Sequence, residues 1–182
     1  MPKQDLQANL NVFETRLASL ERILDKAKTE LLSSTYLEAD LLSARLAADM
    51  LPFPYQIIFT CNQPNQLMAW LKDESLPDPE IDPAAASFEE LVNHLQKTRQ
   101  DLTETRKTAE QTLLDRDKLI QLPNDLSFTL SGHDYVSEWL MPNFYFHFVT
   151  TYDILRAEGL GIGKADYMQH LMPVIVAQQA RT

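Results

Sequence analysis

Apolar residues recur at alternating spacings of four and three along the first part of the chain. The series comprises Leu6, Leu10, Phe13, Leu17, Leu20, Leu24, Ala27 and Leu31, with charged residues on its flanks. This period of 3.5 predicts a helix over about residues 4–32. Because no other segment carries so regular a heptad, the pattern favours one helix of a bundle over a coiled coil.

A second helical segment is predicted over residues 37–50, which are rich in helix-favouring alanine and leucine. Thr35 and Glu38 have the spacing of a capping box in front of it. Pro52 and Pro54 then interrupt the segment, since proline is tolerated in the first turn of a helix but not in its interior.

The next helix is predicted to begin at Asp49 or Leu51 and to extend to about Trp70. Its apolar residues lie on nearly all sides, which is typical of a helix enclosed by its neighbours. Its apolar surface also exceeds what one side of a bundle needs, so we expect part of it to contact a second chain.

The middle of the chain contains a loop, a helix and a hairpin. Residues 76–86 hold three prolines and predict a loop, after which Ser87 and Glu90 form a capping box for a helix of about 28 residues. Residues 118–131 then change to a period of two on both sides of a Pro-Asn-Asp turn, which predicts a short β-hairpin. Because a lone hairpin is only marginally stable, we expect its apolar face to lie on the bundle.

The stretch from Ser131 to Gly159 predicts the last long helix, with Ser131 as its N-cap and Gly159 as its end. One stripe of this helix consists of Val136, Leu140, Asn143, His147, Thr150 and Ile154. Asn143 and His147, one turn apart, are its strongly polar members and the first candidates for a functional site. A short helix over about residues 164–171 and a fraying tail to residue 182 are predicted to follow.

Composition narrows the class of protein. With 182 residues, 45% of them hydrophobic, the chain is expected to form one domain over residues 1–182. The formal charge of −10, without a cluster of lysine and arginine, argues against nucleic acid as the main partner. No apolar run reaches the roughly 20 residues of a membrane span, and the N-terminus lacks a signal-peptide core.

The single cysteine, Cys61, excludes an internal disulfide and fits a reducing compartment, so we expect a cytoplasmic protein. It lies in the apolar run IIFTCN, where burial would raise the pKa of its thiol. We therefore interpret Cys61 as a structural residue and not as a nucleophile.

Four motifs resemble a family of bacterial proteins of unknown function within the DinB-like (DinB/YfiT) superfamily. They are LLSARLAADMLPF at 41–53, FTLSGHDYV at 128–136, MPNFYFHFVTTYDILR at 141–156 and GIGKADY at 161–167. The resemblance covers nearly the whole chain. It implies an all-α, up-down four-helix bundle with a small β-hairpin before the last long helix, and a homodimer formed through helix faces.

The resemblance also implies a metal site that is degenerate in this chain. Better-known superfamily members bind a divalent metal through one histidine on the second bundle helix and an HxxxH pair on the last, and some use it for thiol-dependent transfer or isomerisation. Here the pair reads Asn143 and His147, and the second-helix position is Asp49 or a neighbour, since residues 1–93 contain no histidine. Asp49, Asn143 and His147 would hold a divalent metal only weakly.

Each candidate residue also has a purely structural interpretation. His147 would be a hydrogen-bonded core residue, and Asn143 would satisfy backbone groups freed at Pro142. Asp49 would cap a helix. Arg45, one turn before Asp49, would either pair with it or receive an anionic ligand.

Two classes of function remain. In the first, Asp49, Asn143 and His147 form a polar pocket at one end of the bundle, with Arg45 at its rim, which binds a small ligand or another chain without a cofactor. In the second, the same residues hold a weakly bound divalent metal in a divergent metal-dependent (thiol) transferase or isomerase. Because two of the superfamily's three imidazoles are missing, the first class is favoured, and whether the chain is an enzyme stays open.

Overall fold

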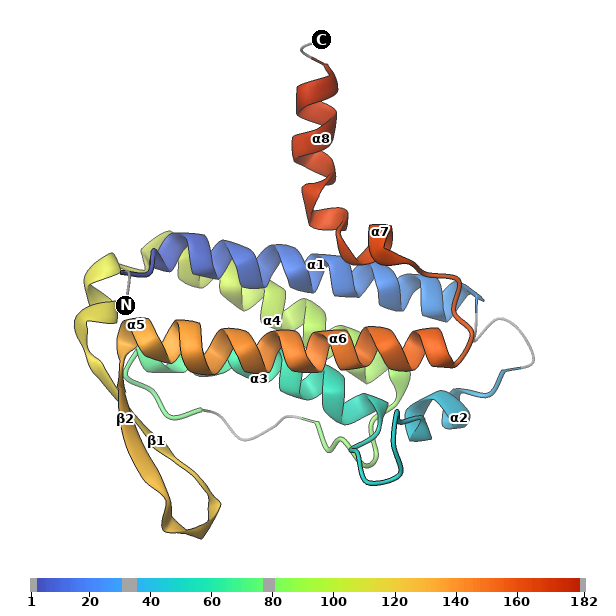
Figure 1. Ribbon diagram of the computed structural model, residues 1–182, viewed down its shortest axis with the longest axis horizontal. Helices are drawn as coiled ribbons and strands as arrows, with labels where there is room; N and C mark the ends of the chain where they lie inside the picture. The colour runs from blue at the N-terminus through green and yellow to red at the C-terminus, as the bar shows by residue number, and fades with distance from the viewer. Residues whose placement is uncertain (1–2, 31–35, 77–80, 181–182) are drawn as a thin grey trace.

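The computed structural model describes residues 3–30, 36–76 and 81–180 of the chain. Its body is a bundle of long helices, from which a two-stranded hairpin projects (Figure 1). The bundle helices are α1 (Leu6–Glu30), α3 (Phe53–Leu71), α4 (Phe88–Thr108) and α6 (Met141–Ala157). The predicted all-α bundle with a small hairpin before the last long helix is therefore confirmed.

Shorter elements connect and extend the bundle. They are α2 (Glu38–Ser43), β1 (Asp117–Gln121), β2 (Ser127–Ser131), α5 (Gly132–Asp134), α7 (Lys164–Tyr167) and α8 (Met172–Gln179). In the part of the chain that is described, no helix is long and apolar enough to cross a membrane.

Antiparallel pairs of helices form two sides of the bundle. Along α1 and α4, Glu21 pairs with Arg99 and Glu14 pairs with Arg106, so the two helices run in opposite directions. Between α3 and α6, Gln56 faces His147 and Trp70 packs edge-on against Tyr135 beside the start of α6. The up-down arrangement is thus present in both of these pairs.

The third contact, between α3 and α4, joins two helices that run in the same direction (Figure 1). Phe53 and Phe88, at the first residues of the two helices, stack with their ring centroids 6.3 Å apart. We expected four long antiparallel helices, and α3 with α4 departs from this. So does α1 with α6, since Gln4 and Lys26 near the two ends of α1 bond His133 before α6 and Gly161 after it. Because α4 starts beside the start of α3, the end of α3 at Leu71 and the start of α4 at Phe88 lie at opposite ends of the bundle.

The apolar seam of α1 lies in the core, as its period predicts. Every member from Leu6 to Ala27 is buried, and Phe13 packs edge-on against Phe144 of α6 at a centroid distance of 4.9 Å. Leu31, the last member, lies outside the described residues. The predicted helix over residues 4–32 agrees with α1 to within two residues at each end.

The helix predicted over residues 37–50 is wrong beyond Ser43. Ala44 adopts an extended conformation, and the chain stays irregular until Pro52, which is the N-cap of α3. Asp49 therefore caps no helix. The carbonyl of Ala44 accepts a hydrogen bond from the N–H of Phe53, so the segment folds back on the start of α3 and cannot continue α2. Thr35, of the predicted capping box, lies outside the described residues.

The fourth helix begins with the predicted capping box of Ser87 and Glu90 but ends at Thr108, earlier than predicted. Its end is held by Gln7 of α1, whose side-chain nitrogen donates to the carbonyls of Arg106 and Ala109. A short 3-10 helix follows, in which Leu114 is buried. The last carbonyls of α4 are thus satisfied by a side chain of α1. Helix α4 therefore ends here, although its own sequence would allow it to continue.

The helix predicted from Ser131 to Gly159 forms, with an irregularity that its periodicity does not show. Ser131 caps its start, and Gly159 ends it with a positive φ of 92°. Between α5 and α6, residues 135–140 form a π-helical segment in which the N–H of Met141 bonds the carbonyl of Val136, five residues earlier. Pro142 has no N–H and its ring crowds the preceding turn, which is a common cause of such a bulge.

The hairpin pairs Ile120 with Phe128 in an antiparallel register, as the period of two predicts. The ladder contacts the bundle near its turn end, since Ile120 is buried and Phe128 packs edge-on against Trp139 at 5.8 Å. Its tip projects from the bundle, and Leu126 there is 58% exposed (Figure 1). The expectation that the whole apolar face lies on the bundle is therefore wrong, because Leu126 in the turn is exposed to solvent.

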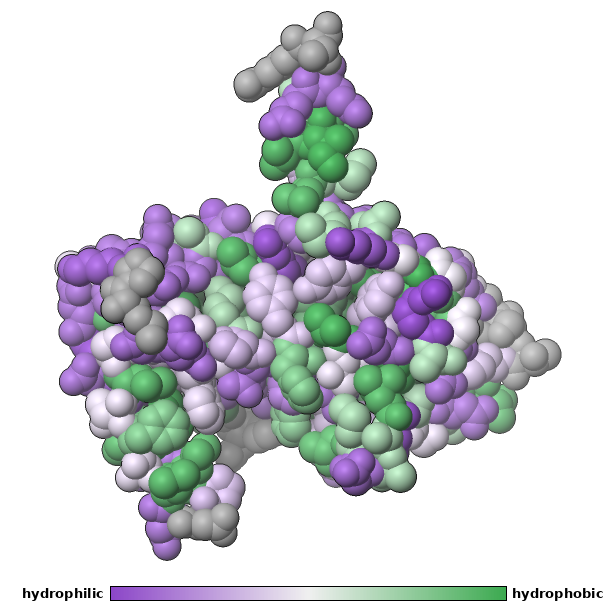
Figure 2. All heavy atoms as spheres, in the orientation of Figure 1, coloured by the Kyte–Doolittle hydropathy of each residue, from purple (hydrophilic) through white to green (hydrophobic). Residues whose placement is uncertain are grey.

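The C-terminal segment is helical where a fraying tail was predicted. Residues 164–171 form α7 and a 3-10 turn, and α8 then continues from Met172, with Pro173 in its first turn. The whole of α8 is exposed and carries no charged side chain, and Figure 2 shows it as an apolar projection from a mostly polar surface. Proline in the first turn favours a new helix.

Replacing core leucines of α1 should destabilise the fold. Leu17→Ala and Leu20→Ala each remove a fully buried side chain, and we expect a loss of about 2–5 kcal/mol in the free energy of unfolding, measured with urea. Leu37→Ala, at a side chain that is 64% exposed, is the control and should change it by less than about 0.5 kcal/mol. A loss below about 1 kcal/mol at both core positions would contradict the assignment of the seam to the core.

The homodimer stays a prediction, and the structure changes the surface to which it is assigned. Most of α3 is buried within the single chain, so its apolar surface is already covered. Helix α8 is the better candidate, because an exposed helix of eight residues is only marginally stable without cover. We expect light scattering to give the mass of two chains for the full protein and of one chain after deletion of residues 171–182. A one-chain mass for the full protein at micromolar concentration would exclude the dimer.

Candidate functional site

His147 lies in the middle of α6, where this helix packs against α3. Its Nδ1 atom is 2.9 Å from Oε1 of Gln56, a buried residue in the first turn of α3. The Nε2 atom of Gln56 in turn donates to the carbonyl of Leu51 at 2.8 Å. A continuous chain of hydrogen bonds therefore links α6, through α3, to the irregular segment that precedes α3.

This chain of hydrogen bonds identifies which ring nitrogen of His147 carries the proton. The carbonyl of Leu51 can only accept, so Gln56 must direct its Nε2 toward Leu51 and its Oε1 toward the imidazole. Because Oε1 is an acceptor, Nδ1 of His147 carries a proton and donates it. In the neutral imidazole, Nε2 is then an acceptor with a free lone pair. It makes no hydrogen bond with the residues that the structure describes.

The surroundings of His147 keep its imidazole neutral. The rings of Phe59 and Phe146 pack edge-on against it, each with a centroid distance of 5.1 Å. Burial among these rings lowers the pKa of His147 below its ordinary value of 6.5. At neutral pH the side chain is therefore a half-buried, uncharged acceptor.

Asn143 lies one turn before His147 on the same helix. Its Nδ2 atom donates to the carbonyl of Trp139 at 2.7 Å, next to the irregularity caused by Pro142. The bond fixes the side chain on its own helix, although the carbonyl that loses its α-helical donor at Pro142 is that of Glu138 and not that of Trp139. Its Oδ1 atom makes no hydrogen bond with the described part of the chain and remains able to accept one.

Arg45 and Asp49 lie on the irregular segment between α2 and α3, and both are exposed. The guanidinium of Arg45 donates to the carbonyls of Ser43 and Met50, at 3.4 and 3.5 Å, and so bridges the segment. Asp49 makes no side-chain hydrogen bond or ion pair with any residue that is described, so it is not paired with Arg45. Arg45 also lines a cavity of about 480 Å³, together with Leu51 and residues 83–86.

The structure thus joins His147 to a residue that the sequence analysis did not single out. Gln56 takes the place expected for Asp49 as the polar partner from the second long helix of the bundle, while Asn143 and His147 do share one face of α6. Arg45 reaches this region only indirectly, through the segment that ends at Leu51. The signal in the sequence that could have identified Gln56 is its position as a polar residue inside the apolar run YQIIF.

The donor atoms around His147 fit a metal only in part. Within residues 3–30, 36–76 and 81–180, no group of three or more histidine, cysteine, aspartate or glutamate side chains is placed to hold a metal ion. His147 and Asn143 present one imidazole nitrogen and one amide oxygen. Asp49, the third candidate ligand, is exposed on the irregular segment before α3.

Cys61 lies away from this chemistry. Its side chain is fully buried in α3, and burial raises the pKa of its thiol to about 12. The thiolate is therefore not formed at neutral pH, as its interpretation as a structural residue requires.

Comparison with known proteins places the chain in a family. A family model described as "Domain of unknown function (DUF1993)" matches residues 6–168, which span α1 to α7 and end before α8. None of the curated proteins compared with the chain matches it.

A solved structure supports the fold. The crystal structure of a DinB family member protein from Shewanella denitrificans is 26% identical in sequence, with a TM-score of 0.72. The match covers 87% of this chain and 88% of that one. The chain is thus similar to a DinB family protein over most of its length, as the motifs predict.

Protonation of His147 should destabilise the folded chain. Because burial lowers its pKa, the neutral imidazole contributes stability that is present above about pH 6.5 and is lost as the pH falls through the lower folded-state value. We expect His147→Gln to lose less free energy of unfolding than the wild type between about pH 7.5 and pH 5, measured by urea unfolding. Equal losses in the two proteins would contradict the assignment.

Proposed function

The chain belongs to the DUF1993 family, whose description assigns no function, and on this premise we propose that it binds a small ligand where α3 and α6 meet. The observation that carries the proposal is the Nε2 atom of His147. It is a half-buried acceptor, held in one orientation by Gln56 and without a partner among the described residues. Such an atom gains free energy when a donor reaches it.

The polar atoms on the face of α6 that carries Asn143 and His147 define the chemistry of the ligand. His147 Nε2 and Asn143 Oδ1 are both acceptors, on adjacent turns of α6, so the ligand must bring hydrogen-bond donors. Phe59 and Phe146 flank the imidazole, so an apolar body beside the donors is favoured. A small amine or alcohol with a hydrocarbon portion has both features.

Arg45 and Asp49 are proposed to form the outer edge of the same site. The hydrogen-bond chain from His147 through Gln56 ends at Leu51, two residues beyond Asp49, so binding at the imidazole and the position of this segment are linked. A free carboxylate at Asp49 suits a ligand amine, and Arg45 suits an anionic group at the far end of a ligand. Binding of a ligand of this kind requires no cofactor.

A metal-dependent transferase or isomerase is the second candidate function. One observation favours it. Nδ1 of His147 donates to the Gln56 oxygen, which leaves Nε2 as the free ring nitrogen, and metal-binding histidines commonly have this arrangement. Such a site would combine His147 and Asn143 with Asp49, and its divalent metal would be weakly bound. The metal would supply Lewis-acid chemistry, while Gln56 would orient the imidazole.

We place the protein in the cytoplasm on the basis of its single buried cysteine, which a reducing compartment keeps as a thiol. A small molecule and a second copy of the chain are the partners proposed here. The net charge of −10 argues against nucleic acid.

Thermal unfolding with defined probes tests the proposal. We expect at least one member of a panel of primary amines and small alcohols to raise the melting temperature of the wild type. His147→Ala should abolish this increase and retain the fold, whereas His170→Ala, in the turn after α7, should leave it unchanged. The same panel extended with zinc, nickel and magnesium separates the two candidate functions, since a response to metal alone favours the second.

Gln56→Leu sharpens the test, because it leaves the imidazole in place but removes the acceptor that fixes its tautomer. We expect weaker binding of the same probe, with an unchanged circular dichroism spectrum. Absence of any response in the wild type, or a response that survives His147→Ala, would exclude His147 as the binding residue.

A further inference from the structure

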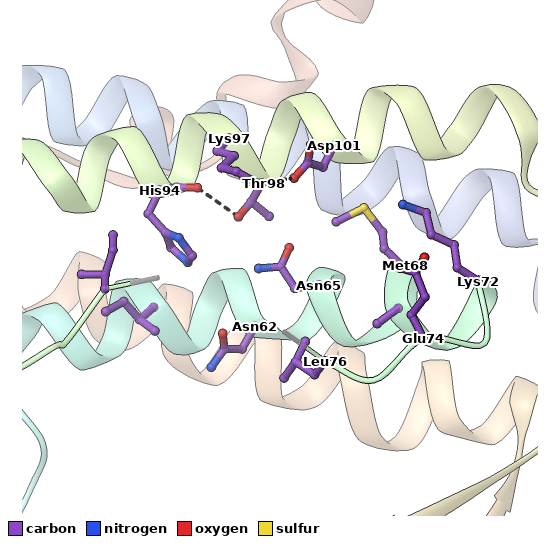
Figure 3. A pocket seen from close by; sticks show the side chains of 13 residues that line it. Asn62, Asn65, Met68, Lys72, Glu74, Leu76, His94, Lys97, Thr98 and Asp101 are labelled. Carbon is purple, nitrogen blue, oxygen red and sulfur yellow. Dashed lines mark hydrogen bonds and ion pairs between the residues drawn. The ribbon is translucent and has the colours of Figure 1, made fainter. Parts of the chain in front are cut away.

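A cavity of about 250 Å³ lies between α3 and α4 (Figure 3). His147 is not among the residues that line it. The two helices that line it run in the same direction. Leu76 and Ile81, from the connection over residues 72–87, form part of its outer wall.

The facing surfaces of the two helices are polar at this cavity. Asn62 and Asn65 of α3 line it on one side, and His94 and Thr98 of α4 line it on the other. Figure 3 shows Asn65 in the space between the helices, on the side of Thr98. Helices that only pack together would present apolar side chains here, as α1 and α6 do with Phe13 and Phe144.

The two asparagine amides have no hydrogen-bond partner among the residues described. Each amide offers two donors and one acceptor oxygen. Both side chains are partly shielded from solvent, and unpaired polar groups in such a position are costly. A guest with both donors and acceptors would satisfy them.

Charged side chains of both signs line the cavity. Lys97 and Asp101 pair with each other at 3.2 Å. Lys72 and Glu74, where α3 ends, make no ion pair with the described residues. These two side chains can therefore receive one anionic and one cationic group without breaking an existing pair.

We propose that this cavity binds a free α-amino acid with a polar, uncharged side chain. Its carboxylate would lie against Lys72 and its ammonium group against Glu74, while its side chain would extend between the amides of Asn62 and Asn65. The volume agrees with this class, since pockets for drug-sized molecules usually start at about 300 Å³. A glutamine-sized guest provides the matching donors and acceptors.

The test measures binding of glutamine, serine, leucine, glutamate and lysine to the full chain by isothermal calorimetry and thermal unfolding. We expect glutamine or serine to bind and to raise the melting temperature, and the apolar or charged amino acids to bind at least about tenfold more weakly. Glutamine that lacks a free ammonium group, as its N-acetyl derivative, should also bind about tenfold more weakly.

Matched variants connect binding to the cavity. Lys72→Met and Glu74→Gln should each weaken glutamine binding about tenfold, while Lys107→Met and Glu104→Gln, at an exposed ion pair near the end of α4, should leave it unchanged. His147→Ala should also leave it unchanged, so failure here and failure of the α3–α6 site are distinguishable. Circular dichroism and urea unfolding check that each variant is folded.

Three outcomes would overturn the proposal. The first is that no amino acid of the panel binds, and the second is that glutamine binding survives both Lys72→Met and Glu74→Gln. The third concerns the double variant Asn62→Leu with Asn65→Leu. If it raises the melting temperature and retains glutamine binding, the amides only line a hydrated gap.

Discussion

The parallel alignment of α3 and α4 is the constraint on which the other features of this bundle depend. Stacking of Phe53 on Phe88 brings the starts of the two helices together, so the chain must return over the length of α3 before α4 begins. That return places Leu76 and Ile81 over the groove between the helices, and it leaves α4 free to pair with α1. Helix α3 is consequently enclosed by α4 on one side and α6 on another, which explains why its sequence is apolar on nearly all sides.

The proline in α6 has a comparable influence on the candidate site. Pro142 offers no N–H to the preceding turn, which adopts π-helical bonding, and beside it the side chain of Asn143 donates to the carbonyl of Trp139. The structural and the functional interpretations of this asparagine are therefore compatible, because its nitrogen supports the backbone while its oxygen stays available. π-Helical turns inside helices often occur at functional sites, since they alter which side chains face a neighbouring helix.

The sequence predicted what depends on local spacing and missed what depends on partners distant in the chain. The seam of α1, the capping box at Ser87, the end at Gly159 and the hairpin register follow from neighbouring residues, and all are present. The early end of α4 depends on Gln7, and the partner of His147 is Gln56, so neither could be read from a single segment. The direction of α4 is likewise invisible to periodicity, because an amphipathic stripe is the same in either orientation.

The distribution of polar groups around α3 explains how one fold can combine a stable core with two candidate binding regions. Gln56 and Asn62 are six positions apart, so at about 100° per residue they point to sides of the helix that differ by roughly 120°. One side meets α6 and His147, and the other meets α4 and the cavity. The buried seam of α1 supplies apolar stability away from both regions. Polar groups between packed helices cost free energy unless they are paired. Gln56 is paired with His147 and Leu51. The amides of Asn62 and Asn65, in contrast, have no partner among the described residues, so a bound guest is favoured most strongly on the α4 side.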